Sequence, residues 1–137
     1  MRIKSIAVLI SSLLLLFVYT TSFAADEDTP EKKPSYVSLG EAMVLNLSNN
    51  KKLSFLQLKA DVLVSSDDAQ EIVQANIPAI RHQLIVLLSE QSAIDMRTPV
   101  KREEVRQLAT AQVRSLIEEM TANKDIEEVL FTVFLVQ

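Results

Sequence analysis

Apolar positions alternate with other residues along two early stretches of the chain, which is the two-residue period of a β-strand. In the first stretch the apolar positions are Val37, Leu39, Met43, Leu45 and Leu47. In the second, residues 53–64, they are Leu56, Leu58, Ala60, Val62 and Val64, and Gln57, Lys59 and Asp61 point the other way. We predict two strands joined by a hairpin turn at residues 48–52, where asparagine tolerates positive φ. One face of the second strand should be buried and the other exposed to solvent.

The last stretch, residues 127–137, is the most β-prone segment outside the N-terminal region, because Val, Phe and Leu dominate it. Strict alternation would put Leu130, Phe134 and Val136 on one face, and Val129, Phe131, Val133 and Leu135 on the other. A strand that is apolar on both faces should be central, with helices on one side and further cover on the other.

Three interpretations remain for what covers the face of the last strand that carries Leu130, Phe134 and Val136. Leu130, Phe134 and Val136 could form an oligomer or partner face, which is the interpretation we favour. The first helix or the linker could instead wrap around to cover them, or the strand could pair through its edge. If the partner interpretation holds, Phe134→Asp should weaken assembly and leave the domain folded.

Between the second and the last strand, apolar residues recur every three to four positions, which is the period of an α-helix. Ser65-Ser66-Asp67-Asp68 is typical of a capped helix start, and this short helix should reach about Asn76. Pro78 suits the first turn of a second helix, whose apolar stripe is Ile77, Ile80, Leu84, Leu87 and Leu88. A third helix should span residues 100–122, with Arg106 and Arg114 on its polar side.

The order β-β-α-α-α-β predicts an α+β fold, with the helices packed on one face of a small, mainly antiparallel sheet. Gly40 is the only glycine in the chain. It marks a bulge, a close backbone approach or an ordinary loop position within the first strand.

The N-terminal region reads as an export segment. Arg2 and Lys4 precede an uncharged run, residues 5–25, whose apolar core is Ile6, Val8, Leu9, Leu13, Leu14, Leu15, Leu16, Phe17 and Val18. Ser22-Phe23-Ala24 before Ala25 fits signal-peptide cleavage between Ala24 and Ala25. The run also has about the 20 residues that a transmembrane helix needs. We therefore predict an anchor or signal peptide at residues 1–25, a charged linker at 26–35 and one exported domain at 36–137.

Composition narrows the classes of function. A formal net charge of −4 argues against a nucleic-acid partner. The chain has no cysteine, a single histidine (His82) and a single glycine, which leaves no thiolate site, no multi-histidine metal site and no phosphate-binding glycine loop. The acidic pairs Glu118-Glu119 and Glu127-Glu128 lack an apolar setting that would separate their pKa values. We predict a protein that is not an enzyme, with no catalytic, metal or cofactor site and no small-molecule substrate.

The apolar N-terminus and the charged linker are followed by a series of recognisable segments. They are Val44-Leu45-Asn46-Leu47 after Tyr36, residues 53–62, Ile77-Pro78-Ala79-Ile80-Arg81 with Leu84 and Leu87-Leu88-Ser89, and the closing Val129-Leu130-Phe131-Thr132-Val133-Phe134-Leu135-Val136-Gln137. Together these features resemble the flagellar basal-body-associated FliL family. The resemblance extends from Tyr36 to the C-terminus. It implies a single-pass inner-membrane protein whose periplasmic domain is similar to the stomatin/prohibitin fold. It also implies a homo-oligomeric ring around the flagellar stator that supports motility, swarming and chemotaxis, with no catalytic residues.

The start of the chain differs from the family pattern. Typical members carry a cytoplasmic tail and a longer apolar span, whereas only residues 1–4 precede the apolar run here. An alternative is a soluble periplasmic paralogue that acts as a carrier or a chaperone-type binding module.

Overall fold

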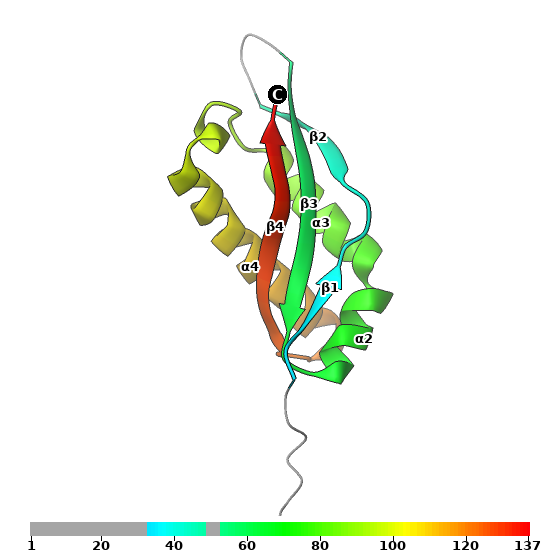
Figure 1. Ribbon diagram of the computed structural model, residues 1–137. Helices are drawn as coiled ribbons and strands as arrows, with labels where there is room; N and C mark the ends of the chain where they lie inside the picture. The colour runs from blue at the N-terminus through cyan, green and yellow to red at the C-terminus, as the bar shows by residue number, and fades with distance from the viewer. Residues whose placement is uncertain (1–32, 49–52) are drawn as a thin grey trace, which may run out of the picture. The chain divides into compact units, whose positions relative to one another are not determined.

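The computed structural model describes residues 33–48 and 53–137, all within one compact unit, Lys32–Gln137. Its elements are β1 (Ser35–Ser38), β2 (Met43–Leu47), β3 (Ser54–Val64), α2 (Asp67–Ala75), α3 (Ile77–Ser89), the 3-10 helix η1 (Asp95–Arg97), α4 (Pro99–Thr121) and β4 (Ile126–Val136). The helices α2, α3 and α4 lie behind an antiparallel sheet (Figure 1). The predicted α+β class and order of elements are confirmed.

Some predicted features lie outside the described residues. They are the apolar run at residues 5–25, the cleavage position at Ala24 and Ala25, most of the charged linker, and residues 49–52 of the hairpin turn. Within residues 33–48 and 53–137, no helix has both the length and the apolar character needed to cross a membrane.

β3 is the central strand of the sheet. β1 and β2 pair with separate parts of β3, as Val37 opposite Val62 and Leu45 opposite Leu56 show. β4 pairs with β3 along nearly its whole length, so it must occupy the other edge of β3. The prediction that the last strand is central is therefore wrong, because β4 is an edge strand. β3, which is flanked on both sides, keeps the predicted alternation of buried and partly or fully exposed residues.

The first predicted strand is divided into β1 and β2 at Gly40. This residue has φ +89°, in a region that side chains with a Cβ rarely adopt. Arg81 holds the break from α3, because its Nη1 donates to Leu39 O at 2.8 Å and to Glu41 O at 2.7 Å. Gly40 is needed for its backbone angle, since a Cβ there would meet nothing closer than 3.9 Å.

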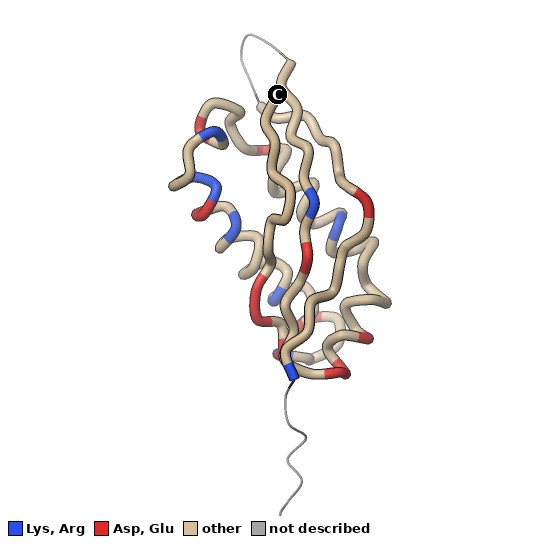
Figure 2. Tube along the Cα trace, viewed as in Figure 1, with Lys and Arg blue, Asp and Glu red and all other residues tan. Residues whose placement is uncertain are grey.

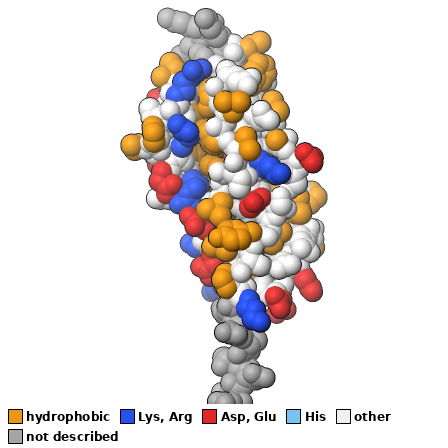
Figure 3. All heavy atoms as spheres, viewed as in Figure 1, with side chains coloured by type: hydrophobic (Ala, Val, Ile, Leu, Met, Phe, Trp, Pro, Cys, Tyr) orange, Lys and Arg blue, Asp and Glu red, His pale blue; other side chains and the backbone are white. Residues whose placement is uncertain are grey.

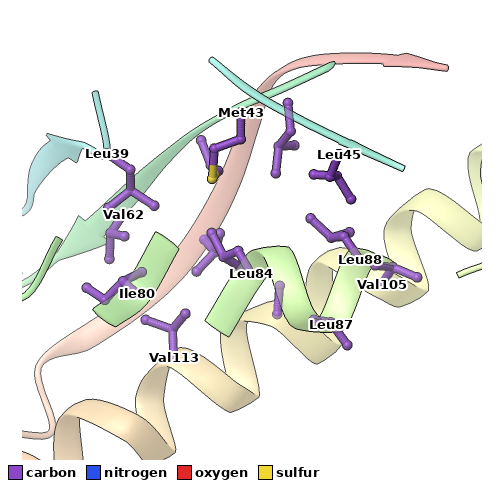
Figure 4. Close-up of a cluster of buried hydrophobic side chains, with 14 of the residues drawn as sticks. Leu39, Met43, Leu45, Val62, Ile80, Leu84, Leu87, Leu88, Val105 and Val113 are labelled. Carbon is purple, nitrogen blue, oxygen red and sulfur yellow. The ribbon is translucent and has the colours of Figure 1, made fainter. Parts of the chain in front are cut away.

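Local signals in the sequence account for where the helices α2 and α4 begin. Ser66 accepts a hydrogen bond from Ala69 N at 3.2 Å and begins α2, as predicted. Thr98 accepts one from Lys101 N at 3.3 Å at the start of α4, where Pro99 is the first helical residue. The predicted stripe of α3 packs on β2, β3 and α4, and its residues Ile80, Leu84, Leu87 and Leu88 are buried (Figure 4).

Candidate functional site

A β-bulge in β4 changes which side chains share a face. Val133 lies opposite Lys59 and Phe131 lies opposite Ala60, so Thr132 is an extra residue in the strand. Before the bulge, Val129 and Phe131 face the helices. After it, Phe134 and Val136 do so, and both pack against the core.

The expectation that Leu130, Phe134 and Val136 lie together on one face is therefore wrong. Leu130 pairs with Asp61 on the opposite, open side of the sheet. The physical reason is that one inserted residue reverses a two-residue alternation, and the sequence pattern carries no mark of the insertion. Whether any of the three residues contacts a partner stays a prediction.

The open side of the sheet, which we call the outer face, carries several large apolar side chains in solvent. They are Tyr36, Val44, Phe55, Val133 and Leu135, and Val44 is 69% exposed. The charged residues Lys59 and Asp61 lie between them. Figure 3 shows this face, with apolar side chains toward both ends of the sheet and charged ones near its middle. The outer face is a candidate surface for protein contacts.

The free edge of β4 is capped over its first half by side chains of α4. Val129 N donates to Thr110 Oγ1 at 3.0 Å, and Val129 O accepts from Arg106 Nη1 at 3.1 Å. Arg114 donates to Ile126 O at 2.8 Å and also to Glu127 O. Because Arg106, Thr110 and Arg114 are spaced by four residues, they form one row along the helix. This row satisfies backbone groups that an edge strand otherwise presents to other chains.

Ion pairs hold Arg106 in that row. Its Nη2 lies 2.7 Å from Glu103 Oε1, and its Nη1 pairs with Glu128. The hydrogen bonds from Arg106 and then from Gln107 lower the pKa of Glu103 to about 2. Hydrogen bonding to Glu103 in turn raises the pKa of Arg106. The Glu103–Arg106 ion pair is thus charged on both sides throughout the physiological pH range.

The second half of the β4 edge has no such cap. Gln137 and Phe55 exchange both of their backbone hydrogen bonds, each at 2.9 Å. In an antiparallel ladder the backbone groups of Val133 and Leu135 then also face β3, while those of Phe134 and Val136 point away from it. Within the described part of the chain, these outward groups have no hydrogen-bond partner.

Arg102 continues the row of α4 by one turn but does not reach this half of the edge. Its guanidinium carbon lies 5.7 Å from the centre of the Phe134 ring, and its Nη2 donates to Arg97 O at 3.2 Å. Its Nε is buried with no hydrogen-bond partner. Figure 2 shows basic residues recurring along the half of α4 that lies beside β4.

A groove lies between this uncapped edge and the start of α4. One part, of about 310 Å³, is lined by Pro99, Arg102, Glu103, Phe131 and Phe134. The adjoining part, of about 200 Å³, is lined by Met96, Arg97, Arg102, Phe134, Leu135 and Val136. We call this feature the β4 groove.

The sequence did not predict the groove, because Arg106 and Arg114 were assigned only to the polar side of the helix. The available signal was the four-residue spacing of Arg102, Arg106, Thr110 and Arg114.

The other residues considered for chemistry do not converge. His82 is exposed on α3. Among the residues that the structure describes, no group of three or more His, Cys, Asp or Glu side chains could hold a metal ion.

A family model described as flagellar basal body-associated protein FliL matches residues 36–137. A search of curated proteins finds no match.

Proposed function

Because the chain belongs to the family of flagellar basal body-associated FliL proteins, we propose that it is a non-enzymatic accessory protein of the flagellar motor. It oligomerises around the stator and supports it, and so affects motility, swarming and chemotaxis. Family membership over residues 36–137 is the observation that carries this proposal.

The proposal includes a location at the cell inner membrane. Residues 1–25 act as a single-pass anchor, residues 26–35 as a linker, and residues 36–137 as a periplasmic domain. The supporting observation is the uncharged run at residues 5–25, which follows Arg2 and Lys4. The alternative is cleavage after Ala24, which would release a soluble periplasmic protein.

The outer face is the surface that we assign to assembly. Tyr36 and Val44 are 67% and 69% exposed there, and Leu130 is half-buried on the same side. Burial of such side chains contributes about 25 cal/mol per Å² of apolar surface, which favours association with a second protein surface. An assembled ring would support the stator by binding its ion-conducting state more tightly than its closed state.

The test is a motility assay in a flagellated host. Deletion of the gene should reduce swimming and swarming, and Val133→Asp should do the same because it places a charge on the outer face. Val133 is opposite Lys59 and 38% exposed, so the domain should stay folded, which circular dichroism would check. The matched control is Ile94→Asp, at a 71% exposed position between α3 and η1. Normal swimming and swarming of the deletion strain would exclude the motor role.

Fractionation and N-terminal sequencing distinguish the two locations. A retained residue 1 in the inner-membrane fraction supports the anchored form. A chain that begins at Ala25 in the periplasmic fraction supports the soluble alternative.

A further inference from the structure

We propose that the β4 groove binds an extended, acidic segment of a partner protein, which adds to β4 as a further strand. The proposal rests on the geometry and charge of the groove, and it does not require the proposed role at the stator.

The backbone of β4 provides the ladder for such a strand. The N–H and C=O groups of Phe134 and Val136 point away from β3 and have no partner among the described residues. Side chains of α4 cap the edge only at residues 126–129. A segment that pairs with an exposed edge gains main-chain hydrogen bonds, and pockets for its alternate side chains provide the selectivity.

The groove has apolar walls beside that ladder. The Phe131 and Phe134 rings are stacked with their centres 5.5 Å apart, and both are only partly buried. With Val136 and the buried Met96 they form a surface below the position of an added strand. Alternate side chains of the added strand would face this surface, because residues i and i+2 share a face.

The charge of the groove selects an acidic partner. Arg97 and Arg102 have no carboxylate partner in the described part of the chain, and Arg102 Nε is unpaired. The N-terminus of α4 at Pro99 adds the positive end of a helix dipole. Glu103 also lines the groove, but Arg106 and Gln107 hold its carboxylate. An acidic side chain would therefore pair with a guanidinium, that of Arg102, which no carboxylate of the described residues neutralises.

A second copy of this chain fits the groove less well. If two copies paired through their β4 edges about a two-fold axis, Arg97 and Arg102 of both copies would lie along the same side of the joint sheet. Like charges placed together across an interface oppose association. A partner segment with acidic and small apolar residues on one face avoids this repulsion.

The test measures binding of labelled peptides to the purified full-length chain by fluorescence anisotropy. The probe is the peptide Asp-Thr-Val-Thr-Asp-Thr-Val, which presents Asp and Val on one face. We expect saturable binding, and a loss of about tenfold for Arg102→Gln, because one charge-assisted hydrogen bond is removed. Lys124→Gln is the matched control, since it removes the same charge from an exposed residue outside the groove. It should bind the probe as the unmodified chain does.

Two further peptides test the mode of binding. A version with Lys in place of Asp tests the charge, and a version N-methylated at every residue cannot donate to a strand ladder. Weak binding of both supports the proposal. Equal binding of either one would overturn it, and so would an unchanged affinity of Arg102→Gln. Self-association that blocks the probe would also overturn it, because the occupant would then be a second copy.

Discussion

The hydroxyl of Thr110 links α4 to the edge of β4, and its removal should destabilise the fold measurably. Thr110 is 7% exposed, and its Oγ1 accepts from Val129 N at 3.0 Å and donates to Arg106 O at 3.0 Å. Thr110→Val keeps nearly the same shape but leaves the N–H of the fully buried Val129 without a partner. An unsatisfied buried donor costs about 1–3 kcal/mol, which is the expected loss in the free energy of unfolding.

Urea denaturation of the full-length chain measures this loss. The midpoint should fall while the slope stays constant, because the surface exposed on unfolding hardly changes. The melting temperature should fall by roughly 4–8 °C for each kcal/mol lost, as for other domains of about this size. Thr110→Ser retains the hydroxyl and should keep the cap of Val129. Our reasoning about the edge cap would be refuted if Thr110→Val were as stable as the unmodified chain, or if Thr110→Ser were the more damaging change.

Three further predictions concern other parts of the fold. Arg106 and Gln107 lower the pKa of Glu103 from 4.5 to about 2, so the ionised carboxylate stabilises the fold above pH 4.5 and this contribution is lost as the pH falls toward 2. Glu103→Gln should therefore make the urea midpoint less dependent on pH within that window, and an unchanged dependence would contradict the assignment. Gly40→Ala should cost about 1–2 kcal/mol, because φ is +89° there; Gly40→Asn should cost less in the same denaturation assay. Leu84→Ala should cost about 2–5 kcal/mol, because the side chain is fully buried. An Ile85→Ala control should lose much less, since that residue is 37% exposed.

Much of the fold could be predicted from local patterns. The alternation along β3 identified its buried residues, and Ser66 and Pro78 marked the starts of α2 and α3. The apolar stripe of α3 identified Ile80 and Leu84 as core residues. These predictions succeeded because periodicity and capping depend on neighbouring residues in the chain.

The candidate site could be predicted only in part. The sequence indicated that the last strand carries apolar residues beyond those that the helices cover. It did not identify which residues these are, because the bulge at Thr132 moves Phe134 and Val136 to the helix side and leaves Leu130 on the outer face. Nor did it show that Arg106 and Arg114 bind the backbone of β4.

The sequence by itself determined the order of the longer strands and helices, the buried face of β3 and the resemblance to the FliL family across residues 36–137, but not the division of the first strand into β1 and β2. The tertiary structure decided that β3 is central, that β4 is an edge strand, and that α4 caps only the first half of that edge. The physical reason is that strand order, bulges and edge caps arise from pairing between segments far apart in the chain. A local pattern of apolar and polar residues records which faces are buried, but it does not record which segment lies beside which.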